Sequence, residues 1–139
     1  LGACTDSNFS DGFRLPGTFA PVCSFDLIKI CVDIAEETGV RYHVGNILST
    51  DRFYKDEGDL APTERSAALW SRMGVLAVEM EAAALYMNAA RCGKRALAIC
   101  TISDHLITGE TTNADERQSS FTDMMALALE TARRVGDSR

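Results

Sequence analysis

The sequence lacks the features of several common protein classes. It has only two histidines among 139 residues, and its five cysteines include no Cys-x-x-Cys pair. Neither histidine stands at metal-ligand spacing from a cysteine, so we expect no metal site. Cys31, Cys92 and Cys100 lie in apolar segments, and the number of cysteines is odd, so we expect these three to be buried free thiols in a reducing compartment and the protein to be cytoplasmic.

Long apolar runs and clusters of basic residues are also missing. No stretch approaches the unbroken apolar length of a membrane span, so we expect no membrane insertion. The net charge is −6 and the Lys and Arg residues are scattered. This argues against nucleic acid as a partner, because a phosphate backbone needs a basic patch. The chain opens with Leu1-Gly2-Ala3-Cys4 rather than Met, and we expect it to begin within a strand.

The residues that are present indicate an α/β protein. Apolar residues make up 46% of the chain, which is enough for the core of one domain. Short apolar segments alternate with amphipathic ones, a pattern typical of parallel strands joined by helical crossovers. We predict a mixed, largely parallel sheet flanked by helices. The expected strands are 1–5, 41–50, 75–78 and 95–103, and the expected helices are 25–38, 62–73, 81–92 and one that follows Asn113.

Apolar spacing predicts which faces are buried. Ser24 can cap a helix whose apolar stripe is Ile28, Cys31, Val32 and Ala35, and Gly39 can end it. In the last helix, Phe121, Met124, Met125, Ala128 and Leu129 are spaced to form one apolar stripe. The segment 95–103 is apolar without alternation, which predicts a strand in the middle of a covered sheet.

Chemically active side chains follow three of the predicted strands. In open α/β sheets, ligands bind beyond the carboxyl ends of the strands. The residues at those ends are Asp51 to Tyr54, Glu79 to Glu81, and Asp104 with His105. If the strands are neighbours, the three clusters share one rim of the sheet.

Each of these residues has a structural and a functional interpretation. Glu79 and Glu81 suit the first turn of a helix, and an ionised carboxylate also suits the two hydroxyl donors of a ribose diol. Asp104 either shapes a turn or takes part in catalysis. A carboxylate that follows a buried strand needs hydrogen-bond donors, an ion-pair partner or a catalytic role. Phe53 either covers the core or stacks on a heterocyclic base, and Arg117 is otherwise a solvated surface residue.

Several motifs together resemble one enzyme family. The segments 78–83 (Val-Glu-Met-Glu-Ala-Ala), 101–105 (Thr-Ile-Ser-Asp-His) and 116–118 (Glu-Arg-Gln) resemble the bacterial hexameric purine nucleoside phosphorylases of the nucleoside phosphorylase-I superfamily. The segments 2–7 and 49–54 are similar as well, so the resemblance covers the chain from end to end. Glu-Met-Glu occurs across the superfamily, whereas Ser-Asp-His followed by Glu-Arg-Gln is selective for the purine branch.

The resemblance implies a reaction and its requirements. Purine ribonucleosides and deoxyribonucleosides would be cleaved reversibly by phosphate to the free base and the (deoxy)ribose 1-phosphate. Phosphate would be the co-substrate, no cofactor would be needed, and the protein would be a homohexamer.

The resemblance also implies a role for each matched residue. Met80 and Glu81 would hold the ribose, with Glu79 beside them. The other implied contacts are Phe53 stacked on the base, Val78 lining the base pocket, Ser103 near the base edge, Asp104 donating a proton to purine N7, and Arg117 paired with Asp104.

The chain departs from the family pattern in two respects. The segment between Tyr54 and Val78 is several residues longer than that pattern. The family's N-terminal part, with its phosphate-binding glycines and arginines and a histidine lent by a neighbouring subunit, has no counterpart here. We therefore expect residues 1–139 to be the C-terminal part of a single α/β domain, weakly active or inactive alone.

Other functions stay open. A nucleosidase of the same superfamily would use water instead of phosphate, and an inactive piece would bind a partner chain. Uridine phosphorylase is disfavoured, because a pyrimidine has no N7 for Asp104 to protonate.

Overall fold

The computed structural model describes residues 1–52 and 56–137, without the side chains of Glu116, Arg117, Ser119 and Asp137. The chain divides into two compact units. Unit 1 comprises Leu1–Cys23 and Val44–Ala96, and unit 2 comprises Ser24–His43 and Leu97–Arg139.

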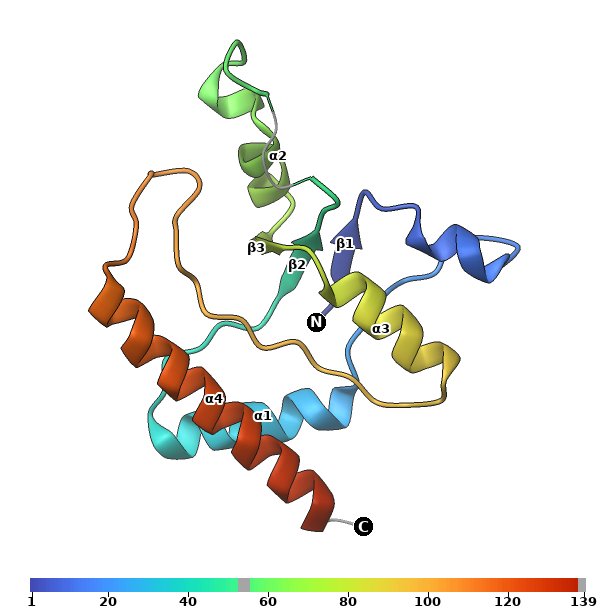
Figure 1. Cartoon of the computed structure of the whole chain (residues 1–139), viewed down its shortest axis with the longest axis vertical. Coiled ribbons are helices and arrows are strands. Elements are labelled where there is room, and N and C mark those ends of the chain that lie inside the picture. Colours follow the sequence, from blue (N-terminus) through green and yellow to red (C-terminus); the bar gives the residue numbers. More distant parts are fainter. Residues whose placement is uncertain (53–55, 138–139) are drawn as a thin grey trace. The chain divides into compact units, whose positions relative to one another are not determined.

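Unit 1 is built on a parallel sheet (Figure 1). Its strands are β1 (Ala3–Thr5), β2 (Asn46–Ser49) and β3 (Val75–Glu79), in the order β1-β2-β3. Ala3 pairs with Ile47, and Leu48 pairs with Val78. The predicted α/β class, with a largely parallel sheet flanked by helices, is confirmed.

The strand predicted at 41–50 is shorter than expected. Its ladder begins at Asn46 opposite Val75 and at Ile47 opposite Ala3. The neighbouring strands themselves begin at Ala3 and Val75, so in the described sheet they offer residues 41–45 no position to pair with.

The helix α3 (Ala82–Arg91) packs against β1 of this sheet, and the short 3₁₀ helix η1 (Phe9–Phe13) packs against α3. The buried residues of α3 are Ala82, Ala83, Tyr86 and Met87. Small residues in its first turn allow close packing on the sheet, where Ala3 and Leu48 are also buried. The first turn of α3 is thereby fixed at the end of β3, where part of the site was predicted.

The helix predicted from Pro62 to Met73 is divided in two. A 3₁₀ turn, η2 (Pro62–Glu64), precedes α2 (Ser66–Arg72). Arg65 between them is extended, with ψ 147°, so the helix restarts at Ser66. The Glu57 carboxylate accepts the Ser66 N–H at 3.0 Å and satisfies a donor that the break would otherwise leave unbonded.

Unit 2 contains two packed helices, α1 (Phe25–Thr38) and α4 (Ala114–Asp137) (Figure 1). Their core consists of Cys31, Ile34, Ala35 and Leu127. Gly39 ends α1 in the left-handed conformation, as predicted. Ser24 occupies the N-cap position, but its side chain makes no cap hydrogen bond, so that detail of the prediction is wrong.

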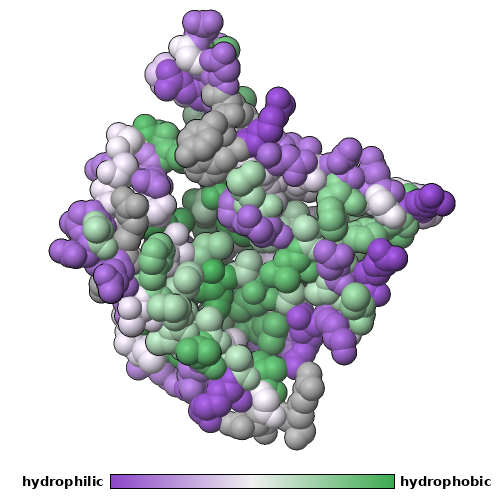
Figure 2. Space-filling model, viewed as in Figure 1, coloured by the Kyte–Doolittle hydropathy of each residue, from purple (hydrophilic) through white to green (hydrophobic). Residues whose placement is uncertain are grey.

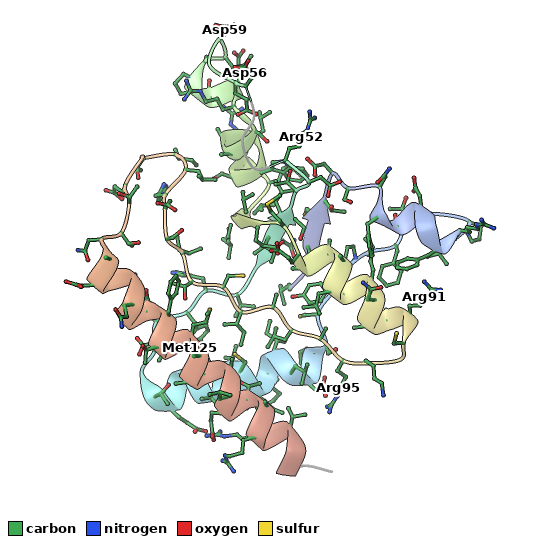
Figure 3. All side chains as sticks on the ribbon, viewed as in Figure 1. Arg52, Asp56, Asp59, Arg91, Arg95 and Met125 are labelled. Atoms are coloured by element: carbon green, nitrogen blue, oxygen red, sulfur yellow. The ribbon has the colours of Figure 1, made fainter. Side chains whose placement is uncertain are left out.

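The predicted apolar stripe of α4 is not its buried face. Phe121, Met125 and Leu129 are 41%, 52% and 72% exposed, whereas Leu127 and Thr131 are buried. Among the described elements α4 packs against α1, and this one helix covers only part of the apolar surface of α4. Hydrophobic side chains are accordingly visible along α4 in Figure 2, and Met125 is labelled in Figure 3.

The strand predicted at 95–103 is also wrong. In the described part of the chain, residues 94–103 form no helix or strand, and the sheet consists of β1, β2 and β3. Leu97 and Ile99 instead pack against the core of unit 2. Two alternate residues of this segment thus pack against helices, as the side chains of a covered strand do. The segment itself is not hydrogen-bonded as a strand of the described three-stranded sheet.

The cysteines, all of them described, form no disulfide, as predicted, but only Cys31 is buried. Cys31 lies in the core of unit 2, where burial raises the pKa of its thiol against a smaller lowering effect of the Thr131 hydrogen bond. Cys92 and Cys100 are exposed, contrary to the expectation. No helix of the described residues combines the length and apolar character that a membrane span requires.

Candidate active site

The three strands of unit 1 end at a common edge because they are parallel. Asp6 follows β1, Thr50 follows β2 and Met80 follows β3. The main chain ties two of these ends together, since the Thr50 N–H donates to the Glu79 carbonyl oxygen at 3.0 Å. Two of the three clusters predicted for the rim, 51–54 and 79–81, therefore begin side by side.

Glu79 lies at this edge with its carboxylate engaged by protein donors. Its Oε2 accepts the N–H of Glu81 at 2.8 Å and of Ala82 at 2.7 Å. Its Oε1 accepts the hydroxyl of Ser49, the last residue of β2. The helix-capping interpretation of Glu79 is thus present in the structure, and contact between Glu79 and a substrate stays a prediction.

Glu81 differs from Glu79 in its surroundings. It occupies the N-cap position of α3, yet its side chain makes no cap hydrogen bond. Its carboxylate is exposed, and Oε2 accepts a bond of 3.3 Å from the Met80 N–H. Met80 is 45% exposed beside it. An exposed acceptor pair at the carboxyl edge of a parallel sheet can receive the hydroxyls of a polar ligand.

Val78 precedes this turn in β3 and is partly buried, with Leu48 as its partner in the ladder. It therefore lies next to Glu79 in β3, at the carboxyl edge of the sheet, and is paired with an apolar residue of β2. That place is compatible with the predicted lining of a base pocket, which stays a prediction.

Asp6, for which no role was predicted, joins the ends of β1 and β2. Its Oδ2 accepts the Thr50 hydroxyl at 2.8 Å, and its Oδ1 accepts the Asp51 N–H at 3.1 Å. Thr50 is only 2% exposed, so this link between the ends of β1 and β2 is sheltered. The position of an aspartate directly after a predicted strand could have indicated it.

Phe53, the predicted stacking residue, lies outside the described residues, as does Tyr54. The chain that leads to it starts at the Asp6–Thr50 link. Arg52 follows this link and is exposed, with its side chain directed away from the sheet (Figure 3).

Ser103 and Asp104 belong to unit 2. The Ser103 hydroxyl donates to Asp104 Oδ2 at 2.6 Å. Asp104 forms an antiparallel bridge with Thr111, and Thr112 donates through its N–H and its hydroxyl to the Ser103 carbonyl oxygen. The pair thus forms the base of a short loop.

Asp104 was predicted to follow a buried strand, and in the structure its side chain is exposed. It is exposed because the preceding residues, 94–103, are not part of the described sheet and so do not carry it into a buried strand end. His105 helps to shape the loop, because its Nδ1 accepts the N–H groups of Ile107 and Thr108 at 3.3 and 3.1 Å. His105 thereby stabilises the loop that carries Asp104.

The backbone of Arg117 lies in the first turn of α4, where a helical residue was predicted. Its side chain lies outside the described part, so its pairing with Asp104 stays a prediction. The described residues contain no group of three His, Cys, Asp or Glu side chains arranged to hold a metal ion.

A separate cavity of about 480 Å³ lies in unit 1 between η1 and α3. It is lined by Phe13, Phe19, Met87 and Arg91 among others. The Arg91 guanidinium lies over the Phe13 ring, 5.2 Å from its centroid. Arg91 is labelled at the end of α3 in Figure 3. The lining residues that α3 contributes, Met87 and Arg91, belong to its C-terminal half, whereas Glu81 stands at its start, so this cavity is not the candidate site.

Comparison with known proteins gives consistent matches. The sequence family described as the phosphorylase superfamily matches residues 2–138. The DeoD-type purine nucleoside phosphorylase of Geobacillus sp. (strain WCH70) is 45% identical over 98% of this chain and 55% of its own length. The protein of the same name from Caldanaerobacter subterraneus subsp. tengcongensis is 49% identical over 95% of this chain and 54% of its own length.

The fold has a counterpart among solved structures. The purine nucleoside phosphorylase of Toxoplasma gondii, in complex with immucillin-H, matches with a TM-score of 0.79 over 99% of this chain and 55% of that one. At 16% identity this likeness concerns the fold alone. The chain spans about half the length of the curated relatives it matches, and the matching half is the C-terminal one.

Proposed function

The chain belongs to the phosphorylase superfamily, and from that membership we propose that it is the C-terminal part of a purine nucleoside phosphorylase. The reaction is the reversible cleavage of purine (deoxy)ribonucleosides by phosphate, which yields the free base and (deoxy)ribose 1-phosphate. Residues 1–139 then form part of a single α/β domain whose phosphate-binding residues lie elsewhere in the protein. The names of the relatives support the choice of a purine substrate.

The observation that carries this proposal is the exposed Glu81 carboxylate at the carboxyl edge of a parallel sheet. The neighbouring Glu79 carboxylate is engaged by Ser49 and by amides of α3, whereas Glu81 makes no cap bond. A carboxylate accepts hydrogen bonds through both oxygens, which matches the vicinal 2′ and 3′ hydroxyls of ribose. Glu81 and Met80 hold the sugar in this proposal, with Glu79 beside them.

The purine base occupies a pocket next to the sugar. Val78 lines this pocket, Phe53 stacks on the base, and Ser103 lies near its edge. An aromatic face suits a heterocycle because offset stacking adds to the gain from burying apolar surface.

Asp104 is the general acid. As the bond between C1′ and N9 breaks, the sugar becomes cation-like and the base accumulates negative charge. A proton delivered to N7 neutralises this charge, and a positioned general acid contributes about a hundred- to ten-thousandfold in rate. Arg117 pairs with Asp104 once the proton has left and stabilises the carboxylate then formed. The Ser103 hydroxyl, which already donates to Asp104, stabilises the same anion.

The remaining expectations follow the same family pattern. Phosphate is the second substrate, no cofactor or metal takes part, and the enzyme is a cytoplasmic homohexamer. Nucleic acid and membranes are not partners.

A phosphate-dependence assay of the full-length protein tests the proposal. Inosine or adenosine is supplied with and without inorganic phosphate, and the sugar product is identified. We expect cleavage only with phosphate, and ribose 1-phosphate as the product. Free ribose formed without phosphate would assign a nucleosidase instead, and no cleavage under either condition would contradict an enzymatic role.

A matched pair of glutamate variants tests whether Glu81 binds the sugar. Glu81→Gln should lower kcat/KM on the order of a hundredfold, because charge-assisted hydrogen bonds to the ribose are weakened. Glu64→Gln changes an exposed glutamate of the same unit, whose carboxylate accepts the nearby Ala61 N–H, and should leave kcat/KM within about twofold. Equal effects of the two changes would remove Glu81 from the site.

A further inference from the structure

Ser49 is a buried hydroxyl residue at the end of β2 that the proposed reaction does not use. Its side chain is 4% exposed, and its hydroxyl bonds in two directions. It donates to Glu79 Oε1 and accepts the N–H of Ala83 at 2.9 Å. A strand residue is thus joined both to the last residue of the next strand and to the first turn of α3.

Together Ser49 and Glu79 satisfy the first amides of α3. Glu79 accepts from Glu81 and Ala82, and Ser49 accepts from Ala83. The first N–H groups of a helix have no partner within the helix, and the side chain of the N-cap residue normally bonds one of them. In α3 the N-cap residue is Glu81, and its side chain makes no such bond.

Capping of α3 by Ser49 and Glu79 affects the Glu81 side chain. If Glu81 capped its own helix, its carboxylate would be turned toward the amides of Ala83 or Ala84, the second and third residues of α3. Ser49 already occupies the first of these amides, and the Glu81 carboxylate stays at the exposed edge. The sheltered Ser49 hydroxyl also fixes the Glu79 carboxylate, so the turn from Glu79 to Glu81 is held from both strands.

We infer that Ser49 and Glu79 form a positioning pair, which caps α3 in place of Glu81 and thereby holds Glu81 available for the sugar. This inference rests on the proposed function. Ser49 touches no substrate in it and acts through Glu79, α3 and Glu81. Glu79 is assigned a positioning role in addition to its place beside the ribose.

Kinetic coupling between Ser49 and Glu81 in the full-length enzyme is the first test. Ser49→Ala should lower kcat/KM for inosine by roughly tenfold to a hundredfold, since small misplacements of binding groups have effects of this size. In a Glu81→Gln background the same change should lower it less than about twofold, because the group being positioned is already lost. Equal losses in both backgrounds would overturn the inference, since they would show an effect independent of Glu81.

Conservative replacement separates positioning from packing. Ser49→Thr keeps the hydroxyl and should recover most of the activity lost in Ser49→Ala. Thr131→Val removes a different buried hydroxyl, one that bonds the Leu127 carbonyl oxygen within α4, and serves as the matched control. It should reduce thermal stability while leaving kcat/KM for inosine within about twofold. A loss in Thr131→Val as large as in Ser49→Ala would mean that any buried hydroxyl has this effect, and would contradict the inference.

Amide hydrogen exchange tests the contact without reference to activity. Losing one hydrogen bond of ordinary strength should speed exchange of the Ala83 amide by roughly fivefold to tenfold in Ser49→Ala. An unchanged Ala83 rate would refute the capping by Ser49 whether or not the enzyme is active. Absence of phosphorolysis in the wild type would instead refute the proposed function, so the two failures are distinguishable.

Discussion

Asp104 is the residue whose proposed role depends most directly on the chemistry of the leaving base. A base that already carries positive charge at N7 departs without a proton, so its cleavage needs no general acid. The Ser103 hydroxyl and the Asp104–Thr111 bridge hold this carboxylate in an exposed loop, where a ligand can reach it.

Asp104→Asn should therefore separate two substrates. In the full-length enzyme we expect kcat for inosine to fall about a hundredfold or more, and kcat for 7-methylguanosine to fall by less than about fivefold. Steady-state kinetics with both substrates measure this ratio. Equal losses on the two nucleosides would exclude Asp104 as the proton donor.

The difference between Glu79 and Glu81 shows that the role of a single residue can be undetermined by the sequence around it. Both precede or begin a helix and both suit a ribose diol, so the sequence alone leaves capping and binding open for each. The structure separates them through Ser49, which lies thirty positions before Glu79 and reaches it across the sheet. A partner brought together by strand pairing leaves no local pattern, and the Asp6–Thr50 contact was missed for the same reason.

At the scale of elements, local stop signals predicted the ends of helices well. Gly39, Gly74 and Gly93 all adopt positive φ just after α1, α2 and α3. Their conformation is a local property of the chain, since only glycine adopts it without strain. The faces of helices were less predictable, because burial depends on which partner covers them, as Phe121 and Leu129 of α4 show.

Gly39→Ala should destabilise α1. Gly39 has φ 72° and donates its N–H to the Ala35 carbonyl oxygen, so an added Cβ introduces strain of about 1 kcal/mol in the left-handed conformation. Urea unfolding measures the loss. Gly136→Ala is the matched control, because Gly136 lies in the last turn of α4 with open space around it. It should be neutral or slightly stabilising, and a loss of stability equal to that of Gly39→Ala would contradict the assigned cap.

An ion-pair cluster joins the two helices of unit 2 and predicts a dependence of stability on pH. Arg134 bonds Glu130 within α4 at 2.9 Å and Glu37 of α1 at 2.9 Å. Bonds from Arg133 and then Arg134 lower the pKa of Glu130 from 4.5 to about 2, and Arg134 lowers the pKa of Glu37. A carboxylate with a lowered pKa stabilises the fold above its unfolded pKa and ceases to do so as pH falls through its folded value.

Stability of unit 2 should therefore decline as the pH falls from about 4.5 to about 2. In Arg134→Met this decline should become shallower, because Glu37 loses its arginine partner and Glu130 loses one of the two arginine bonds that lower its pKa. Thermal unfolding at pH 7 and pH 3 measures it, and added salt should weaken the effect since the groups are exposed. Arg72→Met removes an exposed positive charge from α2 and should leave the slope unchanged. An unaltered slope in Arg134→Met would contradict this account.

The segment 95–103 marks the limit of prediction for elements. Its unbroken apolar run predicted a central strand, yet the described sheet ends at β3 on one side and β1 on the other. A strand requires neighbours to pair with as well as suitable side chains, and the identity of those neighbours is not encoded in the segment itself. Leu97 and Ile99 nevertheless pack on α1 and α4, so its apolar character is used.

At the scale of the whole molecule, the alternation of strands and helices predicted the α/β class and the parallel order of the sheet. Motif resemblance predicted the family, which the match over residues 2–138 confirms. The sequence pattern could not predict the arrangement of the site. Its proposed residues are divided between the two units: Met80 and Glu81 belong to unit 1, and Ser103 and Asp104 belong to unit 2.

The central claim is that Glu81 and Asp104 serve one bound nucleoside, the first at its sugar and the second at its base. A crystal structure of the full-length protein with a purine nucleoside analogue measures this directly. The account predicts Glu81 carboxylate oxygens within hydrogen-bond distance, about 2.6–3.2 Å, of the 2′ and 3′ hydroxyls, and an Asp104 oxygen at a similar distance from N7. A nucleoside bound by Glu81 with Asp104 in no contact with its base, or the two carboxylates in separate cavities, would contradict it.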